Sequence, residues 1–169
     1  MKRRSLNRAA KMGPPSNRLY TLEVFIFSGP MTEKFVELNP VISRTIQILG
    51  RQTLEDLHYA IFAAFGREEE HMYEFQFGEG PNDPKGDRYV LPAALDDPLS
   101  EHRKPAGDVE RTTIDSLDLK VDQAFGYWFD FGDDWWHQIN VIAIDEEAPR
   151  GKYPKVTKRI GKSPPQYAN

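Results

Sequence analysis

An aromatic segment near the C-terminal end, residues 125–145, constrains the fold more tightly than any other part of the chain. Its two halves alternate apolar and polar residues, as β-strands with one buried face do. The residues that share the apolar face are Phe125, Tyr127, Phe129 and Phe131 in the first half, and Trp135, His137, Ile139, Val141 and Ala143 in the second. Gly132, Asp133 and Asp134 separate the halves, and such residues favour turns. The segment therefore predicts a β-hairpin with an acidic tip.

The register of this hairpin follows from matching the two apolar faces across the strands. A two-residue turn would place Tyr127 opposite Gln138 and mismatch the faces, whereas a three-residue loop at 132–134 matches them. The pairs expected from that loop are Phe125 with Val141, Tyr127 with Ile139, and Phe129 with His137. In the same register, Asp130 lies opposite Trp136.

Four polar side chains around the tip have the composition of a metal site: Asp130, Asp133, Asp134 and His137. Carboxylates suit magnesium or calcium, and histidine suits a transition metal. In the predicted register, however, Asp130 lies on the face away from His137, so one ion would not readily contact both. Aspartate at a loop tip is also favoured by turn geometry alone. We therefore predict a structural turn without a metal or cofactor, and keep a metal-dependent hydrolase that uses these four residues as an alternative.

The second face of the hairpin carries two tryptophans beside amide side chains. Such a combination can stack on a nucleobase or a sugar. The residues of this candidate ligand or partner face are Trp128, Asp130, Trp136, Gln138 and Asn140. The alternative is that another element of the chain covers both tryptophans.

The composition indicates one globular domain in a reducing compartment. The chain has 169 residues, 39% of them hydrophobic and 12% aromatic, which is enough for a packed core. It contains no cysteine, which excludes disulfides, thiolate zinc sites and cysteine nucleophiles. No apolar run approaches the roughly 20 residues of a membrane span, and residues 1–18 lack the apolar stretch of an export signal. We expect a cytoplasmic protein without a membrane partner.

The charges of the chain are divided between the ends and the middle. All 26 acidic residues lie between Glu23 and Glu147, whereas segments 1–18 and 150–169 each carry six cations and no acid. Basic arms of this kind favour phosphate backbones and other polyanions. The residues predicted to contact a polyanion are Lys2, Arg3, Arg4, Arg8, Lys155, Lys158, Arg159 and Lys162. The alternative is that both arms fold back onto the acidic body or only keep it soluble.

The remaining segments predict the fold class. A helix over 53–65 begins with a capping box at Thr53 and Asp56 and ends at Gly66. Further strands are expected at 19–27, 41–49, 72–77 and 88–91. The prediction is therefore an α+β domain over 19–149, with a mixed or antiparallel sheet, one main helix packed on one face and a β-β-α-β order typical of β-grasp topology. Residues 1–18 and 150–169 are expected to be a flexible basic arm and a basic, proline-containing arm.

Three blocks of residues together carry a family resemblance. They are Ser43–Ile46 with Thr53–His58, then His71–Phe75, then Tyr127–His137, which reads YWFDFGDDWWH. With them, the chain resembles the plasmid pRiA4b ORF-3-like family over about residues 19–167. Many members end in a PPED-type tail, where this chain has Pro164-Pro165-Gln166-Tyr167. The resemblance implies a bacterial or archaeal origin and an α+β fold. Some members carry resolvase-like labels or occur in mobile elements, and no catalytic residues of the family are known that could be carried over.

Three functions follow as hypotheses. The leading one is a non-enzymatic accessory or interaction protein that associates with nucleic acid through its basic arms. The second is the metal-dependent hydrolase, which requires the four tip residues to converge in one cleft. The third is a protein-binding module that uses an open sheet edge.

Overall fold

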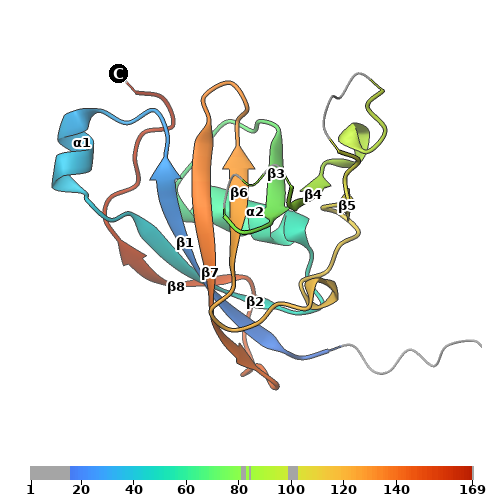
Figure 1. Cartoon of the computed structure of the whole chain (residues 1–169). Coiled ribbons are helices and arrows are strands. Elements are labelled where there is room, and N and C mark those ends of the chain that lie inside the picture. The colour runs from blue at the N-terminus through green and yellow to red at the C-terminus, as the bar shows by residue number, and fades with distance from the viewer. Residues whose placement is uncertain (1–15, 81–82, 84, 99–102, 169) are drawn as a thin grey trace, which may run out of the picture.

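One mixed, open sheet of eight strands dominates the computed structural model, which describes residues 16–80, 83, 85–98 and 103–168 (Figure 1). The strand order is β5-β4-β3-β6-β7-β1-β2-β8, and all neighbours are antiparallel except β4 and β5. The elements along the chain are β1 (Leu19–Ser28), α1 (Glu33–Leu38), β2 (Ser43–Leu49), α2 (Leu54–Ala64), β3 (Tyr73–Phe77), β4 (Asp87–Val90), η1 (Pro92–Ala94), β5 (Gly107–Asp108), η2 (Asp115–Leu117), β6 (Ala124–Phe129), β7 (Trp135–Asp145) and β8 (Lys155–Ile160). Two α-helices in the described residues and a mixed sheet agree with the predicted α+β class.

Helix α2 begins and ends at the signals read from the sequence. The Thr53 hydroxyl accepts the Asp56 backbone N–H, and the Asp56 carboxylate accepts the Thr53 N–H, so both halves of the capping box are present. At the other end, Gly66 has a φ of 62° and donates to Ala63, while Arg67 donates to Phe62. This Schellman motif requires a positive φ, which glycine adopts without a steric cost.

The order of elements at the start of the chain differs from the predicted β-β-α-β. The short helix α1, capped by the Thr32 side chain, lies between β1 and β2, so the order is β-α-β-α-β. Helix α1 has six residues and buries none of them. An apolar period cannot be read over so few residues, and for that reason the sequence did not reveal it. The β-grasp comparison stays a prediction.

The core lies between α2 and one face of the sheet. Leu54, Leu57 and Ile61 of α2 are 0% exposed and join one buried cluster with strand residues such as Leu22 and Ile46. The aromatic hairpin supplies the largest buried side chains of this cluster, which include Trp135, Tyr127, Phe125 and Phe129. The apolar face predicted for the hairpin is therefore the core face, with two exceptions. Ala143 lies beyond a register shift in the pairing with β1 and is only half-buried. Phe131 is 38% exposed because it lies in the loop and not in the strand.

The hairpin register was predicted wrongly by two residues. The observed partners are Phe125 with Ile139, Tyr127 with His137, Trp128 with Trp136, and Phe129 with Trp135. The loop therefore has five residues, 130–134, and the Asp134 N–H donates to the Asp130 carbonyl at 2.7 Å to close it. A shift of two residues keeps every side chain on its face. Face matching can therefore exclude odd shifts but cannot choose between a three-residue and a five-residue loop.

Residues 155–160 of the C-terminal segment form a strand of the sheet and not a separate arm, so the sheet extends past the predicted domain boundary at residue 149. Strand β8 pairs with β2 along its length and forms one edge of the sheet. Arg44, only 3% exposed, holds this edge: it donates to the carbonyls of Ile160 and Gly161 and to the Ser163 hydroxyl. The same guanidinium donates to Ala64 at the end of α2. The expected N-terminal arm lies almost wholly outside the described residues.

The helices of the described chain are short. Neither α1 nor α2 has the length and apolar character that a membrane crossing requires. A cytoplasmic location stays a prediction.

Candidate functional site

The hairpin tip is built around Asp130, which ends the strand in a left-handed conformation with a φ of 60°. Its carboxylate accepts the backbone N–H groups of Gly132 and Asp133 at 3.1 and 3.2 Å. Asp134 also has a positive φ, of 57°, and its carboxylate accepts the indole N–H of Trp128 at 2.9 Å. Aspartate tolerates this backbone region because its short side chain bonds locally. Two of the three tip carboxylates thus organise the loop itself.

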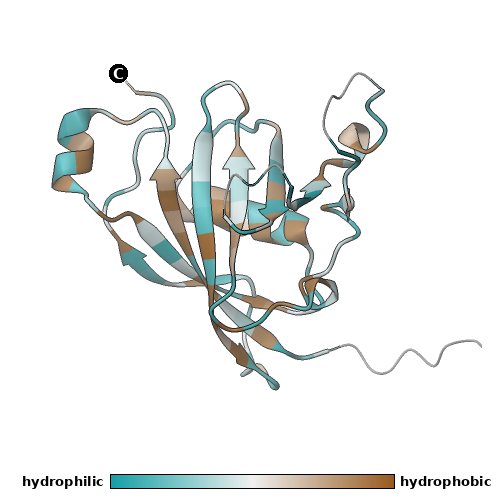
Figure 2. Cartoon of the chain, in the orientation of Figure 1, coloured by the Kyte–Doolittle hydropathy of each residue, from teal (hydrophilic) through white to brown (hydrophobic). Residues whose placement is uncertain are grey.

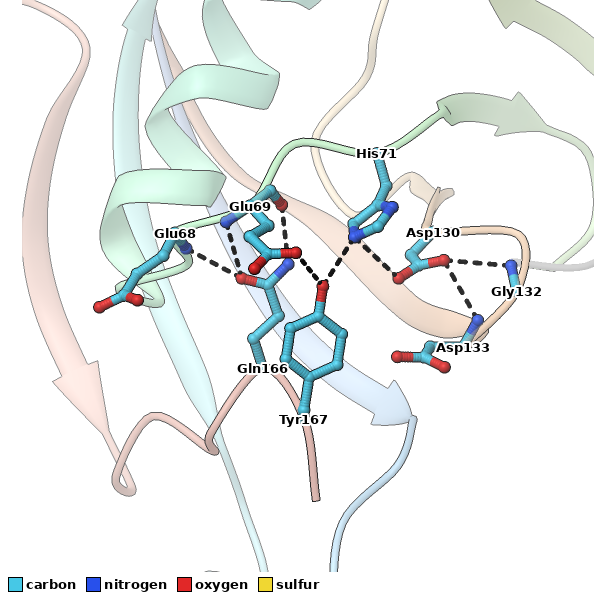
Figure 3. A network of polar contacts seen from close by, with 8 residues as sticks. All are labelled: Glu68, Glu69, His71, Asp130, Gly132, Asp133, Gln166 and Tyr167. Carbon is cyan, nitrogen blue, oxygen red and sulfur yellow. Dashed lines mark hydrogen bonds and ion pairs between the residues drawn. The ribbon is translucent and has the colours of Figure 1, made fainter. Parts of the chain in front are cut away.

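The C-terminal tail closes over the same corner of the molecule (Figure 3). The Gln166 amide accepts the backbone N–H groups of Glu68 and Glu69 and donates to the Glu69 carbonyl. The Tyr167 hydroxyl donates to the Glu69 carboxylate at 2.6 Å and lies 2.9 Å from Nε2 of His71. That nitrogen is in turn 3.5 Å from the Asp130 carboxylate. The tail therefore joins the α2–β3 connection to the hairpin tip.

His137 has no lone pair left for a metal ion. It is 0% exposed, its Nδ1 lies 3.1 Å from the Tyr127 carbonyl, and its Nε2 lies 2.8 Å from a guanidinium nitrogen of Arg67. The carbonyl only accepts and the guanidinium only donates, so Nδ1 carries the proton and Nε2 accepts. Burial and the Arg67 charge hold the pKa of His137 well below its usual range. The four tip residues do not converge on one ion, and no metal-ligand cluster occurs in the described part of the chain.

Substitutions at Asp130 test this structural account of the tip. Asp130→Ala leaves the loop N–H groups of Gly132 and Asp133 without an acceptor and forces alanine into a left-handed backbone. We expect it to lower the free energy of unfolding by about 1–3 kcal/mol in urea titrations. Asp130→Asn, which keeps the acceptor oxygen and tolerates that conformation, should cost less than half as much. Equal losses for the two variants would contradict the account.

The predicted tryptophan–amide face is half-buried and largely paired within itself. Trp136 stacks on Trp128 with the ring centroids 4.6 Å apart, and Phe131 lies 4.2 Å from the same Trp128 ring. The Gln138 amide donates to Asn140 at 2.9 Å. A nucleobase that stacked between Trp128 and Trp136 would therefore have to separate the two rings. Ligand recognition by this face stays a prediction.

A pocket of about 630 Å³ opens beside Trp128 and Phe131. Segments 94–98 and 104–105 form its opposite side, and Glu74 and Arg88 also line it. Arg88 Nε donates to the Glu74 carboxylate at 2.7 Å, and the carboxylate is 3% exposed. These two charges neutralise each other, so the ion pair adds little net charge to the pocket. Trp128 and Phe131 offer a ligand aromatic surface there.

A buried chain of polar groups, which the sequence did not reveal, runs beneath α2. The Tyr127 hydroxyl lies 2.6 Å from Nδ1 of His58, and Nε2 of His58 lies 3.0 Å from the Glu70 carboxylate. Tyr127 also meets His137 through its carbonyl, and His137 meets Arg67. Burial lowers the pKa of His58 to about 3 and that of Arg67 to about 10, so at neutral pH the histidine is neutral and the arginine is charged. Within the described chain, Nη1 of Arg67 and Nε1 of Trp135 have no hydrogen-bond partner.

The basic edge of the sheet is the third candidate. We define it as the six cations Arg150, Lys152, Lys155, Lys158, Arg159 and Lys162, all of them exposed. The C-terminal half of β8 appears in the hydrophilic colour in Figure 2. Among the residues that the structure describes, none of the six forms an ion pair with a carboxylate. Lys2, Arg3, Arg4 and Arg8 lie outside the described residues.

Comparisons with known proteins agree with the sequence blocks. The profile described as plasmid pRiA4b ORF-3-like protein matches residues 34–167. The chain belongs to this family. A similar solved structure is the crystal structure of the protein of unknown function MM3350 from Methanosarcina mazei Go1. It has a TM-score of 0.60 and 26% identity, and the match covers 84% of this chain and 69% of that one. No curated protein matches the chain.

The family blocks of this plasmid pRiA4b ORF-3-like chain can now be placed. Arg44 and His58 both belong to the first block. Arg44 joins β2, α2 and β8, and His58 enters the buried polar chain. Tyr127, Asp130 and His137 of the third block fix the hairpin and its loop. Each of these side chains has a structural partner. These five block residues therefore stabilise the scaffold.

Proposed function

We propose that this protein is a non-enzymatic accessory protein that binds nucleic acid through the phosphate backbone, using the basic edge. The observation that carries the proposal is the set of six exposed cations without carboxylate partners. Were the segment only neutralising its own acidic body, its cations would pair with the 26 carboxylates of the chain. Three of them, Lys155, Lys158 and Arg159, instead lie on the edge strand β8, and the other three flank it, where a polyanion has access.

The spacing of the cations on β8 suits a phosphate chain. Lys158 pairs with Thr45 and Lys155 with Gln47, and a register shift lies between them. Because Thr45 and Gln47 are two residues apart in β2, Lys155 and Lys158 share one face of the sheet. Two residues of strand span roughly 7 Å, so both lysines can contact one phosphate backbone at the same time.

A second property of edge strands has to be separated from this proposal. Lysines on an edge also prevent pairing with another sheet, a role that needs no ligand. The two roles differ in their measurable consequences. Phosphate contacts give an affinity that falls steeply with salt, whereas protection of an edge changes self-association only.

The test is fluorescence anisotropy of labelled single- and double-stranded oligonucleotides with the full chain, titrated at 25–300 mM salt. The triple variant Lys155→Gln, Lys158→Gln, Arg159→Gln should bind at least tenfold more weakly. It should also reduce the slope of log K against log salt by about 2–3, since each lost phosphate contact removes about 0.7–0.9. Point substitutions are required here because β8 is part of the sheet, and its deletion would disrupt the fold.

The matched control is Lys34→Gln, Lys104→Gln, Lys120→Gln, which removes the same charge away from β8. It should leave affinity and slope nearly unchanged. Equal losses in both triple variants, or no saturable binding at 25 mM salt, would exclude the basic edge as a nucleic-acid site. A further variant without residues 1–15 measures the contribution predicted for Lys2, Arg3, Arg4 and Arg8.

A further inference from the structure

A second pocket, of about 540 Å³, lies where the start of β3 meets α2. In the strand order, β3 is in the half of the sheet away from the basic edge. Its lining residues are Glu55, Tyr59, Glu70, His71, Met72, Tyr73 and Leu91. Glu55 and Tyr59 are one helical turn apart on α2, so the carboxylate and the ring project from the same side of the helix. Leu91 follows β4, close to the edge that is farthest from β8.

The charge of this pocket is negative and is not neutralised. Glu55 and Glu70 are its two carboxylates, and no lysine or arginine lines it. Burial, together with the carboxylate of Glu110, raises the pKa of Glu55, and burial raises the pKa of Glu70. The Glu70 carboxylate is hydrogen-bonded to the ring of His58, but this histidine is neutral at pH 7 and supplies no positive charge. A cation that entered would therefore meet charge that the protein itself leaves unpaired.

Tyr73 supplies an independent sign of a ligand. Its side chain is only 3% exposed and is held by His58, whose ring stacks on it with centroids 3.6 Å apart. Yet within the described chain the Tyr73 hydroxyl makes no hydrogen bond, although it lines the pocket. Burial raises the pKa of this hydroxyl, and the charges of Glu55 and Glu70 raise it further, so the hydroxyl lies near both carboxylates. The Tyr73 hydroxyl is therefore a free polar group at the wall of the pocket, able to bond to a ligand.

The walls suit an organic cation better than a bare metal ion. Tyr59 is 54% exposed and presents an aromatic ring to the pocket, and Met72 and Leu91 add apolar surface. Aromatic rings attract alkylammonium groups through their quadrupole, and carboxylates supply the opposite charge. No group of three or more metal-ligating side chains that could hold an ion occurs in the described residues.

We propose that the pocket of Glu55, Tyr59, Glu70 and Tyr73 binds the alkylammonium group of an organic cation. The ammonium lies between the two carboxylates, the Tyr59 ring covers its alkyl part, and the Tyr73 hydroxyl accepts a hydrogen bond from it. The same chemistry is present in a free amine and in a lysine side chain of a partner protein. This site is separate from the basic edge, and it does not depend on nucleic-acid binding.

Calorimetric titration of the full chain at 25 mM salt tests the proposal, with butylammonium and spermidine as free amines and N-acetylated, C-amidated Gly-Gly-Lys-Gly-Gly as the peptide. Uncharged butanol and the norleucine peptide are the matched ligands without the cation. We expect saturable binding of the charged probes and none of the uncharged ones. Tighter binding of the free amines identifies a small-molecule ligand, and tighter binding of the peptide identifies a lysine of a partner.

Two variants test whether binding depends on this pocket or only on the overall negative charge of the protein. Glu55→Gln with Glu70→Gln should weaken binding at least tenfold, and Tyr73→Phe, which removes only the free hydroxyl, should weaken it about threefold. Glu33→Gln with Glu37→Gln on α1 removes the same charge far from the pocket and should change nothing. The proposal is wrong if no charged probe binds saturably, or if the α1 variant loses as much affinity as the pocket variant. Thermal unfolding confirms that each variant is folded.

Discussion

Replacing Arg44 by methionine is expected to lower the free energy of unfolding by roughly 3 kcal/mol, because several buried carbonyls lose a charged donor at once. The guanidinium donates to Ala64 at the end of α2, to Ser43 in its own strand, and to the carbonyls at the end of β8 and just after it, those of Ile160 and Gly161. Methionine fills a similar volume and can pack against Phe65, whose ring lies 4.9 Å from the guanidinium carbon. The loss is therefore one of hydrogen bonds more than of packing.

Urea unfolding measures this effect, and limited proteolysis shows where it acts. In the Arg44→Met protein we expect early cleavage within 155–168, since β8 and the tail lose their anchor to β2 and α2. Arg44→Lys should recover part of the stability, because an ammonium satisfies fewer of these acceptors than a guanidinium. Arg159→Met, at the exposed residue paired with Arg44 across the strands, is the control and should shift stability by less than about 0.5 kcal/mol. Equal losses at Arg44 and Arg159 would contradict the anchor.

Acidification from pH 7 to pH 5 is expected to destabilise the protein through its two buried histidines. Burial holds the pKa of His58 at about 3 and that of His137 well below its usual range, so neither takes up a proton when folded. In the unfolded chain each histidine titrates near pH 6.5, so below that pH the unfolded state binds more protons and is favoured. The stability that depends on neutral histidine is complete above pH 6.5 and is lost as the pH falls.

The expected size follows from the proton linkage. His58 contributes a fall of about 1.4 kcal/mol per pH unit below its ordinary pKa, or about 2 kcal/mol between pH 6.5 and pH 5. His137 adds a fall of the same sign, and the raised pKa values of Glu55 and Glu70 oppose it. The free energy of unfolding from urea titrations at pH 7, 6 and 5 checks this. His58→Gln removes one contribution and should flatten the dependence, and an unchanged slope in that variant would contradict the account.

Much of the scaffold could be predicted because it depends on local pattern. Thr53, Asp56 and Gly66 mark the ends of α2 through bonds to residues within four positions, so they are legible in one sequence. The apolar alternation of the hairpin was legible for the same reason, as was its core face. The loop length was not, because alternation repeats every two residues and the choice of five loop residues depends on the left-handed conformations of Asp130 and Asp134.

The candidate sites were harder to predict because their parts come from distant segments. Glu70 follows α2 and was not singled out, but tertiary folding brings it to His58 and to a pocket shared with Glu55 and Tyr73. The basic C-terminal segment was recognised from its charge alone. Its position as a sheet edge was missed, because β8 is held by long-range pairing with β2 and by Arg44, not by an apolar pattern of its own.

The sequence by itself determined the class of the domain, the helix boundaries, the buried face of the aromatic hairpin and the separation of charge along the chain, because each of these depends on neighbours within a few residues. Only the tertiary structure decided that His137 is a buried histidine with both ring nitrogens hydrogen-bonded. It also decided that the cations of β8 lie on an edge strand without carboxylate partners, and that two glutamates and a free tyrosine hydroxyl share one pocket. Those properties depend on which distant groups meet and on how much water is excluded around them, and a linear pattern carries neither.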